Sequence, residues 1–443
     1  MKQFSINYFA SIIYIIVISL LVVINYSSKA VASVTNSSDI RNYLGTRTPY
    51  RFKSNKDDSK IKYPNCKHSK IWMLLRHGTR LPSAKDILGM NTILKDLKYK
   101  ILMQNNHGKG PLNEEQLHWF SKWSSNISVE QEKFLTYEGQ DEMILLAERM
   151  RKRFPDAIKE KYDNKSFLFK YTATQRAQQS ALYFTIGLFD RKKSRDVIFE
   201  PAMKVDTTLR FYKHCDKWQK QVKKNPETYK EQRAFAVSQA MNDTFDAVAK
   251  NLGLEGVLSK EIVILMYKIC GYETSWHKYY TSPWCYGFDL KSIKTLEYYH
   301  DLKHYWLDGY GHELTSVQAC MILKNMFEMM GKENKTAAFL FSHSGTLLKL
   351  LTHLGLYKPQ THLRGDSVIE DRLWRASNID CFASNIAFVL YKCDDGDKIL
   401  TLHQERVIKL PMCETELCPL EHLKAYFRNT IHNCDFADMC EAV

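Results

Sequence analysis

Several features are missing from the sequence, and each absence narrows the possible functions. No long basic tract, RGG segment or zinc-finger spacing occurs, which argues against nucleic acid as the partner. No spacing of cysteine or histidine is typical of a metal site, so we expect no metal and no other cofactor. Beyond about residue 24, no apolar run is long enough to span a bilayer. Internal repeats and low-complexity segments are also missing, which leaves an ordinary globular protein.

The overall composition sets the size and the charge of that protein. A chain of 443 residues, with 44% hydrophobic and 25% charged residues, is long enough for one large or two medium domains. The formal net charge of +14 favours an acidic partner. Charge alone leaves a phosphorylated metabolite, an anionic glycan, a nucleic acid and a membrane surface as alternatives.

The N-terminal stretch resembles a secretory signal. Lys2 precedes an apolar region from about residue 8 to 24, and Ala30-Val31-Ala32 offers an A-x-A cleavage site. We expect a cleaved signal peptide over residues 1–32, secretion or residence in the secretory lumen, and a loosely ordered lead-in over 33–65. An uncleaved signal anchor is the alternative, and only that alternative would place the protein at a membrane.

Cysteines and sequons agree with that route. Eleven cysteines in a secreted chain imply disulfides, and the odd number leaves at least one thiol free. Candidate pairs are Cys66–Cys393, Cys270–Cys285, Cys413–Cys418 and Cys434–Cys440, although spacing does not fix connectivity. Candidate glycosylation sites are Asn36, Asn126, Asn164, Asn242 and Asn334.

The stretch 70–82, KIWMLLRHGTRLP, is the most informative part of the chain. Its apolar run 71–75 predicts a buried strand that ends at Arg76-His77-Gly78-Thr79-Arg80. The two arginines can bind phosphate oxygens through paired N–H groups, and their charge keeps the His77 imidazole neutral and nucleophilic. Gly78 permits a close backbone approach. The simpler interpretation is a basic surface turn after a strand.

Alternating strands and helices predict an α/β fold with a largely parallel sheet covered by helices. The expected catalytic domain is discontinuous, over 66–204 and 333–432, with an insertion near 83–134. Residues 205–332 are predicted to form a mainly helical cap. Further strands are expected over 167–171, 197–199, 337–341, 386–391 and 399–410.

Two more strand-to-helix turns carry candidate residues, Arg176 and His343. Neighbouring parallel strands bring their carboxyl ends together, so these turns can meet His77 in a phosphate-binding site. Taken alone, Arg176 is better explained by an exposed helix terminus, and His343 by a core histidine.

These motifs resemble the histidine phosphatase superfamily, in the branch of histidine acid phosphatases and phytases. The resemblance is closest to the multiple inositol polyphosphate phosphatases and covers about residues 45–430. It implies a phosphoglycerate-mutase-like sheet with flanking helices and a cap. Beyond RHGTRLP, the similar stretches are LRFYKHC (209–215), SPWCYGFD (282–289), LEYYHDLKHYWLDGYG (296–311) and ASNIAFVLYKC (383–393).

The resemblance implies a phosphomonoesterase that hydrolyses inositol polyphosphates, phytate included, with 2,3-bisphosphoglycerate as a further substrate. His77 would form a phosphohistidine, while Arg76, Arg80, Arg176 and His343 hold the phosphate oxygens. No cofactor is implied, and the partner is a small polyphosphorylated molecule.

One departure concerns the proton donor. The family has His-Ala-Glu-Thr where this chain has His343-Ser344-Gly345-Thr346, so Gly345 stands in place of the glutamate expected to protonate the leaving oxygen. Loss of a general acid typically costs about 10²–10⁴-fold in rate. Two hypotheses follow: an active phosphatase with another, unknown acid, or a pseudophosphatase that binds polyphosphates. A phosphoglycerate mutase of the other branch is the third, disfavoured by the signal sequence and the helical insertion.

Overall fold

The computed structural model describes residues 39–256 and 258–441. The expected signal peptide over 1–32 and the sequon at Asn36 lie outside the described residues. From Ile40 onward the chain is one compact unit, so the predicted division at 205 and 332 stays a prediction. In the described part of the chain, no helix is both long and apolar enough to cross a membrane.

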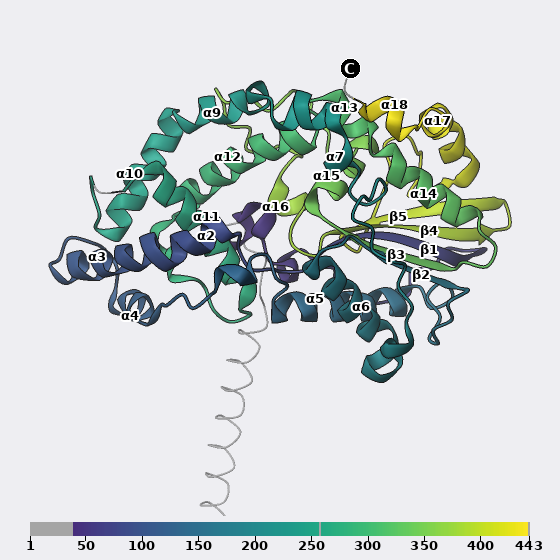
Figure 1. Ribbon diagram of the computed structural model, residues 1–443, viewed down its shortest axis with the longest axis horizontal. Helices are drawn as coiled ribbons and strands as arrows, with labels where there is room; N and C mark the ends of the chain where they lie inside the picture. The colour runs from purple at the N-terminus through teal and green to yellow at the C-terminus, as the bar shows by residue number, and fades with distance from the viewer. Residues whose placement is uncertain (1–38, 257, 442–443) are drawn as a thin grey trace, which may run out of the picture. The chain divides into compact units, whose positions relative to one another are not determined.

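The centre of the fold is a seven-stranded sheet in the order β2-β3-β1-β4-β5-β6, with β7 paired to β5 (Figure 1). Strands β1, β2 and β3 are parallel, and the remaining pairings are antiparallel. The strands are β1 Cys66–Arg76, β2 Phe167–Tyr171, β3 Ala337–Ser342, β4 Asn385–Cys393, β5 Gly396–His403, β6 Arg406–Ile408 and β7 Leu417–Pro419.

The predicted α/β class is therefore confirmed, with a parallel half and an antiparallel half. The antiparallel half follows from tight connections: Cys393 pairs with Gly396 across a two-residue turn, which can only join antiparallel strands. The strand predicted over 399–410 is a hairpin, since Gln404 and Glu405 both take positive φ angles and reverse the chain. The strand predicted over 197–199 is wrong, because these residues belong to no helix or strand and have no place in the sheet.

Strand β1 is buried on both faces because its side chains alternate between two hydrophobic clusters. Ile71, Met73 and Leu75 pack with the apolar residues of α5 and α6, and Trp72 and Leu74 pack into the cluster that includes α14 and α15. These two helix pairs lie on opposite sides of the sheet (Figure 1). The helices concerned are α5 Tyr137–Arg153, α6 Gln175–Lys193, α14 Cys320–Gly331 and α15 Ser344–His353.

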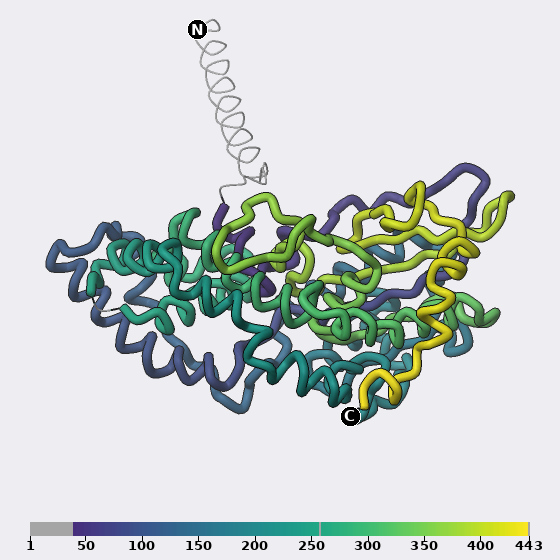
Figure 2. Tube along the Cα trace, turned by 90° about the horizontal axis from the view of Figure 1, so that it is seen from above, coloured from purple at the N-terminus to yellow at the C-terminus, as the bar shows by residue number. Residues whose placement is uncertain are grey.

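The other helices gather mainly beyond the strands, where helices from 84–122 and from 239–308 lie together (Figures 1 and 2). The indole of Trp123 packs edge-on against Trp284, with ring centroids 4.9 Å apart, which joins the early insertion to the later helices. The helices are α2 Ala84–Gly89, α3 Lys95–Asn106, α4 Glu114–Lys122, α7 Phe211–His214, α8 Asp216–Trp218, α9 Lys230–Ala236, α10 Gln239–Leu252, α11 Lys260–Trp276, α12 Leu290–Asp308, α13 Glu313–Val317, α16 Ala376–Ile379, α17 Leu420–His432 and α18 Phe436–Cys440.

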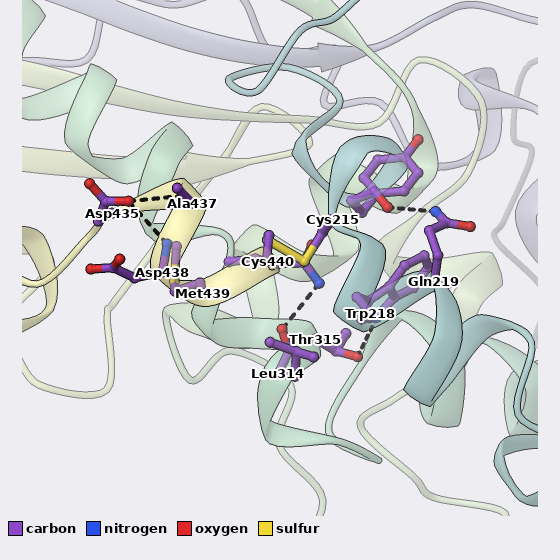
Figure 3. The surroundings of a disulfide bond; sticks show 12 residues. Cys215, Trp218, Gln219, Leu314, Thr315, Asp435, Ala437, Asp438, Met439 and Cys440 are labelled. Carbon is purple, nitrogen blue, oxygen red and sulfur yellow. Dashed lines mark hydrogen bonds between the residues drawn. A yellow bond between two sulfur atoms is a disulfide. The ribbon is translucent and has the colours of Figure 1, made fainter. Parts of the chain in front are cut away.

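Five disulfides join segments of the chain, and Cys381 is a buried free thiol, as the odd count predicts. The predicted Cys434–Cys440 pair is wrong, because α18 places each of the two against a different partner: Cys434 against α14, and Cys440 against the start of α8 (Figure 3). The disulfides are Cys66–Cys393, Cys270–Cys285, Cys413–Cys418, Cys215–Cys440 and Cys320–Cys434.

The sequons within the described residues differ in exposure. Asn126, Asn164 and Asn334 are exposed, whereas Asn242 lies half-buried in α10. Their glycosylation stays a prediction.

Candidate active site

The candidate residues lie at the carboxyl ends of the three parallel strands. Arg76 is the last residue of β1 and is paired in register with Ser342, the last residue of β3. The backbone N–H of His77 continues this pairing by donating to the Ser342 carbonyl at 3.1 Å. On the other side of β3, the Thr172 N–H donates to the Phe341 carbonyl at 3.1 Å, three residues before α6 begins at Gln175.

A close backbone contact shapes the loop after β1. A Cβ added to Gly78 would lie 2.5 Å from the Gly139 carbonyl oxygen of α5, so only glycine fits. Glu142, also on α5, accepts hydrogen bonds from the Thr79 N–H at 2.7 Å and from the Thr79 hydroxyl at 2.9 Å. Helix α5 thereby fixes the loop that presents His77.

The tautomer of His77 follows from its contacts. Its Nδ1 lies 2.9 Å from the Gly78 carbonyl oxygen, an atom that can only accept, so Nδ1 carries the proton. The other ring nitrogen, Nε2, keeps its lone pair. This is the nitrogen available for nucleophilic attack.

His343 and Arg176 are in direct contact beside it. The His77 and His343 ring centroids are 5.5 Å apart. Arg176 Nη2 donates to His343 Nδ1 at 3.3 Å, so the His343 proton sits on Nε2, which donates to Thr172 Oγ1 at 2.9 Å. His343 therefore presents its lone pair to the arginine.

Burial and the surrounding arginines keep both imidazoles neutral. Burial, followed by Arg176 and Arg76, holds the pKa of His77 well below its usual value. Burial, followed by Arg176 and Arg210, does the same to the pKa of His343. Burial lowers the pKa of Arg176 to about 10, with Arg80 and Arg210 adding to the effect, and leaves it charged at neutral pH.

Four arginines of this cluster share an unusual property. Their Nε atoms are buried, and none has a hydrogen-bond partner among the described residues. Planar guanidinium groups with unused donors are suited to binding phosphate oxygens. The four are Arg47, Arg76, Arg176 and Arg210.

Sequence reasoning assigned no role to two of these four. Arg47 stacks on the Tyr272 ring at 5.2 Å, on the same ring that Arg80 contacts at 5.5 Å. Arg210 lies close enough to both Arg176 and His343 to affect their pKa values. The stretch LRFYKHC contained a signal for Arg210, since it was among the family-like segments, but nothing marked Arg47.

The position of the missing glutamate is filled by an aromatic ring. A Cβ added to Gly345 would lie 3.0 Å from Cζ of Tyr212. Tyr212 is held there because the Leu209 carbonyl accepts hydrogen bonds from the Ser342 hydroxyl at 2.7 Å and from the Thr346 hydroxyl at 2.6 Å. The residue before Gly345, Ser344, is partly exposed and donates its hydroxyl proton to the buried carboxylate of Asp380.

Comparison with known proteins agrees with this geometry. The model of the histidine phosphatase superfamily, branch 2, matches residues 69–410. The chain belongs to this family. It is 29% identical over 393 residues to multiple inositol polyphosphate phosphatase 1 of Drosophila melanogaster, covering 85% of this chain and 82% of that protein. It is 26% identical over 447 residues to the Homo sapiens protein of the same name, covering 91% and 90%. The resemblance predicted from the motifs is confirmed.

Solved structures share the fold of this branch 2 chain. The phytase from D. castellii superposes with a TM-score of 0.73 at 17% identity, covering 93% of this chain and 91% of that one. The multiple inositol polyphosphate phosphatase of Bifidobacterium longum, in complex with phosphate, superposes with a TM-score of 0.67 at 14% identity, covering 88% and 98%.

Proposed function

We propose that the protein is a phosphomonoesterase that hydrolyses inositol polyphosphates through a phosphohistidine at His77. The observation that supports this most strongly is that three arginines whose buried Nε groups have no partner among the described residues, Arg76, Arg176 and Arg210, surround two neutral histidines. The relatives named as multiple inositol polyphosphate phosphatases support the substrate class. The net charge of +14 suits a polyanionic substrate. We propose 2,3-bisphosphoglycerate as a second substrate besides the inositol polyphosphates.

In the first step, His77 Nε2 attacks phosphorus and the bond from phosphorus to the ester oxygen breaks. The phosphoryl charge is stabilised by Arg76, Arg80 and Arg176, and His343 contributes by accepting a hydrogen bond that positions Arg176. In the second step, water attacks the phosphohistidine and releases inorganic phosphate, which regenerates the His77 lone pair.

The site of action that we propose is the secretory lumen or the outside of the cell. Five disulfides support it, because such bonds persist in oxidising compartments.

A pseudophosphatase is the second candidate, favoured by Gly345 and by the Tyr212 ring that fills the glutamate position. Phosphate release from inositol hexakisphosphate between pH 3 and pH 8 separates the two. We expect turnover by the natural protein and a loss of at least 10⁴-fold in His77→Ala, as for removal of a nucleophile. Tight binding of the hexakisphosphate without any release would instead establish the pseudophosphatase.

A further inference from the structure

The region around Gly345 contains a carboxyl group that the family motif does not include. Asp380 follows α16, and its side chain is fully buried. One oxygen, Oδ2, accepts the hydroxyl of Ser344, the residue directly after His343. Oδ1 is buried and has no partner among the described residues.

The segment that carries Asp380 is fastened to the His77 loop. The Ala383 N–H donates to the His77 carbonyl at 3.2 Å, and the Arg76 N–H donates to the Ser384 carbonyl at 2.8 Å. The Phe382 ring contacts the side chains of both His77 and Arg76. Its centroid lies 6.3 Å from that of His77 and 4.8 Å from the Arg76 guanidinium carbon.

The neighbouring Arg76 forms an ion pair with Asp380 but donates no hydrogen bond to its carboxyl oxygens. Arg76 Nη1 lies 3.6 Å from Oδ2, beyond hydrogen-bond distance, and this nitrogen donates instead to the backbone carbonyls of Thr46 and of Asp380 itself. An ionised carboxylate here would leave the buried Oδ1 without a donor among the described residues, which is costly. The protonated acid is therefore the form that burial favours.

From this geometry we propose that Asp380 is the proton source for the leaving group, acting through the hydroxyl of Ser344. This proposal rests on the proposed phosphatase function. When Asp380 is protonated on Oδ2, the hydrogen bond with Ser344 reverses: the acid donates to Ser344 Oγ, and the Ser344 hydroxyl proton is free for the substrate. As the phosphorus–oxygen bond breaks, the ester oxygen takes that hydroxyl proton while the Asp380 proton moves to Ser344 Oγ. The inositol leaves as a neutral alcohol, and Asp380 becomes a carboxylate 3.6 Å from Arg76. In the second step, the attacking water returns a proton along the same route.

The protonation of Asp380 agrees with this role. Burial raises the pKa of Asp380 to about 6, against the opposing effects of Arg76, the Ser344 hydrogen bond and His304, and with a small contribution from Asp308. The group is then largely protonated at pH 5 and able to give up its proton.

Two other carboxyl groups in this part of the structure are poorer donors. Asp308 is held by Lys349 Nζ at 2.5 Å and His304 Nδ1 at 3.2 Å. Burial raises its pKa, but the charge of Lys349 and the hydrogen bond from His304 outweigh that effect and hold the pKa of Asp308 well below its usual value, so it carries no proton. Glu142 uses both oxygens to fix Thr79.

The test compares two phosphate monoesters that differ in their need for an acid. Inositol hexakisphosphate has alcohol leaving groups, which need protonation, whereas p-nitrophenyl phosphate releases a stable phenolate. We expect Asp380→Asn to lower kcat for the hexakisphosphate about 10²–10³-fold and kcat for the aryl ester less than tenfold. Ser344→Ala should show the same selectivity. Inhibition by inorganic phosphate should be unchanged in both.

The pH profile gives a second measurement. With the hexakisphosphate, kcat of the natural protein should fall above about pH 6, and this fall should be missing in Asp380→Asn and for the aryl ester. Asp395→Asn, an exposed carboxyl substitution on the β4–β5 turn, is the matched control. Tyr212→Phe tests whether the Tyr212 phenol, rather than Asp380, supplies the proton.

Three results would overturn the proposal. If Asp380→Asn lowers kcat equally for both esters, Asp380 acts only by positioning Arg76. If the variant leaves the kinetics unchanged, Asp380 has no role in the reaction. Selective loss in Tyr212→Phe alone would move the proton source to the phenol. If Asp380→Asn does not fold, Ser344→Ala decides the matter. Absence of any His77-dependent hydrolysis of either ester would instead refute the proposed function itself.

Discussion

The two sides of the proposed active site are built in different ways. The phosphate side, which we define as Arg76, His77, Arg80, Arg176 and His343, stands at the ends of three parallel strands. The leaving-group side, defined as Tyr212, Ser344, Gly345 and Asp380, combines the short helix α7 and the loop after α16 with the first turn of α15, which follows β3. The first side keeps the family motif and the second departs from it. Rigid strands fix the chemistry common to all phosphate esters, while loops can exchange the residues that meet the alcohol.

Removing an arginine from the phosphate side should give the largest effect. We expect Arg176→Ala to lower turnover about 10³-fold on both the hexakisphosphate and the aryl ester, because phosphoryl charge develops with either leaving group. Arg195→Ala, at an exposed arginine beyond the end of α6, is the control. Steady-state kinetics on the two esters is the measurement. If Arg176→Ala lowered turnover for only one ester, Arg176 would not act on the phosphoryl group alone, and the division into two sides would be wrong.

Crowding the leaving-group side should cost stability. In Gly345→Ala the new Cβ would lie 3.0 Å from Tyr212 Cζ, and the buried ring must shift. We expect a decrease of about 1–3 kcal/mol in the free energy of unfolding, measured by urea denaturation. Gly331→Ala, where a Cβ meets nothing within 4 Å, should be neutral or stabilising.

A double variant at Gly345 and Tyr212 identifies the cause of the stability loss in Gly345→Ala. Tyr212→Leu removes the ring, so adding Gly345→Ala in that background should cost little. An undiminished penalty there would show that Tyr212 is not what excludes a side chain at position 345.

A carboxyl outside the site sharpens the comparison with Asp380. Burial raises the pKa of Glu273 to about 7, although Ser282 and Trp123 donate hydrogen bonds to it. Because the folded-state pKa lies above the unfolded value, its stabilising contribution is complete below about pH 4.5 and is lost as the pH rises through 7.

We therefore expect Glu273→Gln to lose less stability than the natural protein between pH 5 and pH 8. The difference should be on the order of 1 kcal/mol, visible as a shift in Tm. Its ratio of hexakisphosphate to aryl ester turnover should be unchanged, in contrast to Asp380→Asn. A changed ratio in Glu273→Gln would mean that the loss of any buried carboxyl alters it, so that the ratio would not be specific to the proton donor.

The phosphate side was predictable from sequence because its signals are local. An apolar run followed by Arg-His-Gly-Thr-Arg marks both the strand and the turn, and parallel strands bring such turns together. The same reasoning placed Arg176 and His343 at their strand ends, where the structure also has them.

The leaving-group side was not predictable, because its contacts join distant segments. Ser344 and Asp380 are 36 residues apart and meet only through packing. The Tyr212 ring reaches Gly345 from another element. The mistaken Cys434–Cys440 pair has the same origin: nearness in sequence favours a short loop, whereas α18 turns the two cysteines to different neighbours.

The Cys215–Cys440 disulfide also sets an order of events during biosynthesis. Cys215 lies three residues after Tyr212, and its partner is synthesised 225 residues later (Figure 3). All phosphate-side residues have left the ribosome by then, while the segment that carries Tyr212 is still without its covalent tie. The residues of the phosphate side can therefore come together before the disulfide fixes the segment that carries Tyr212. That disulfide forms only in an oxidising compartment.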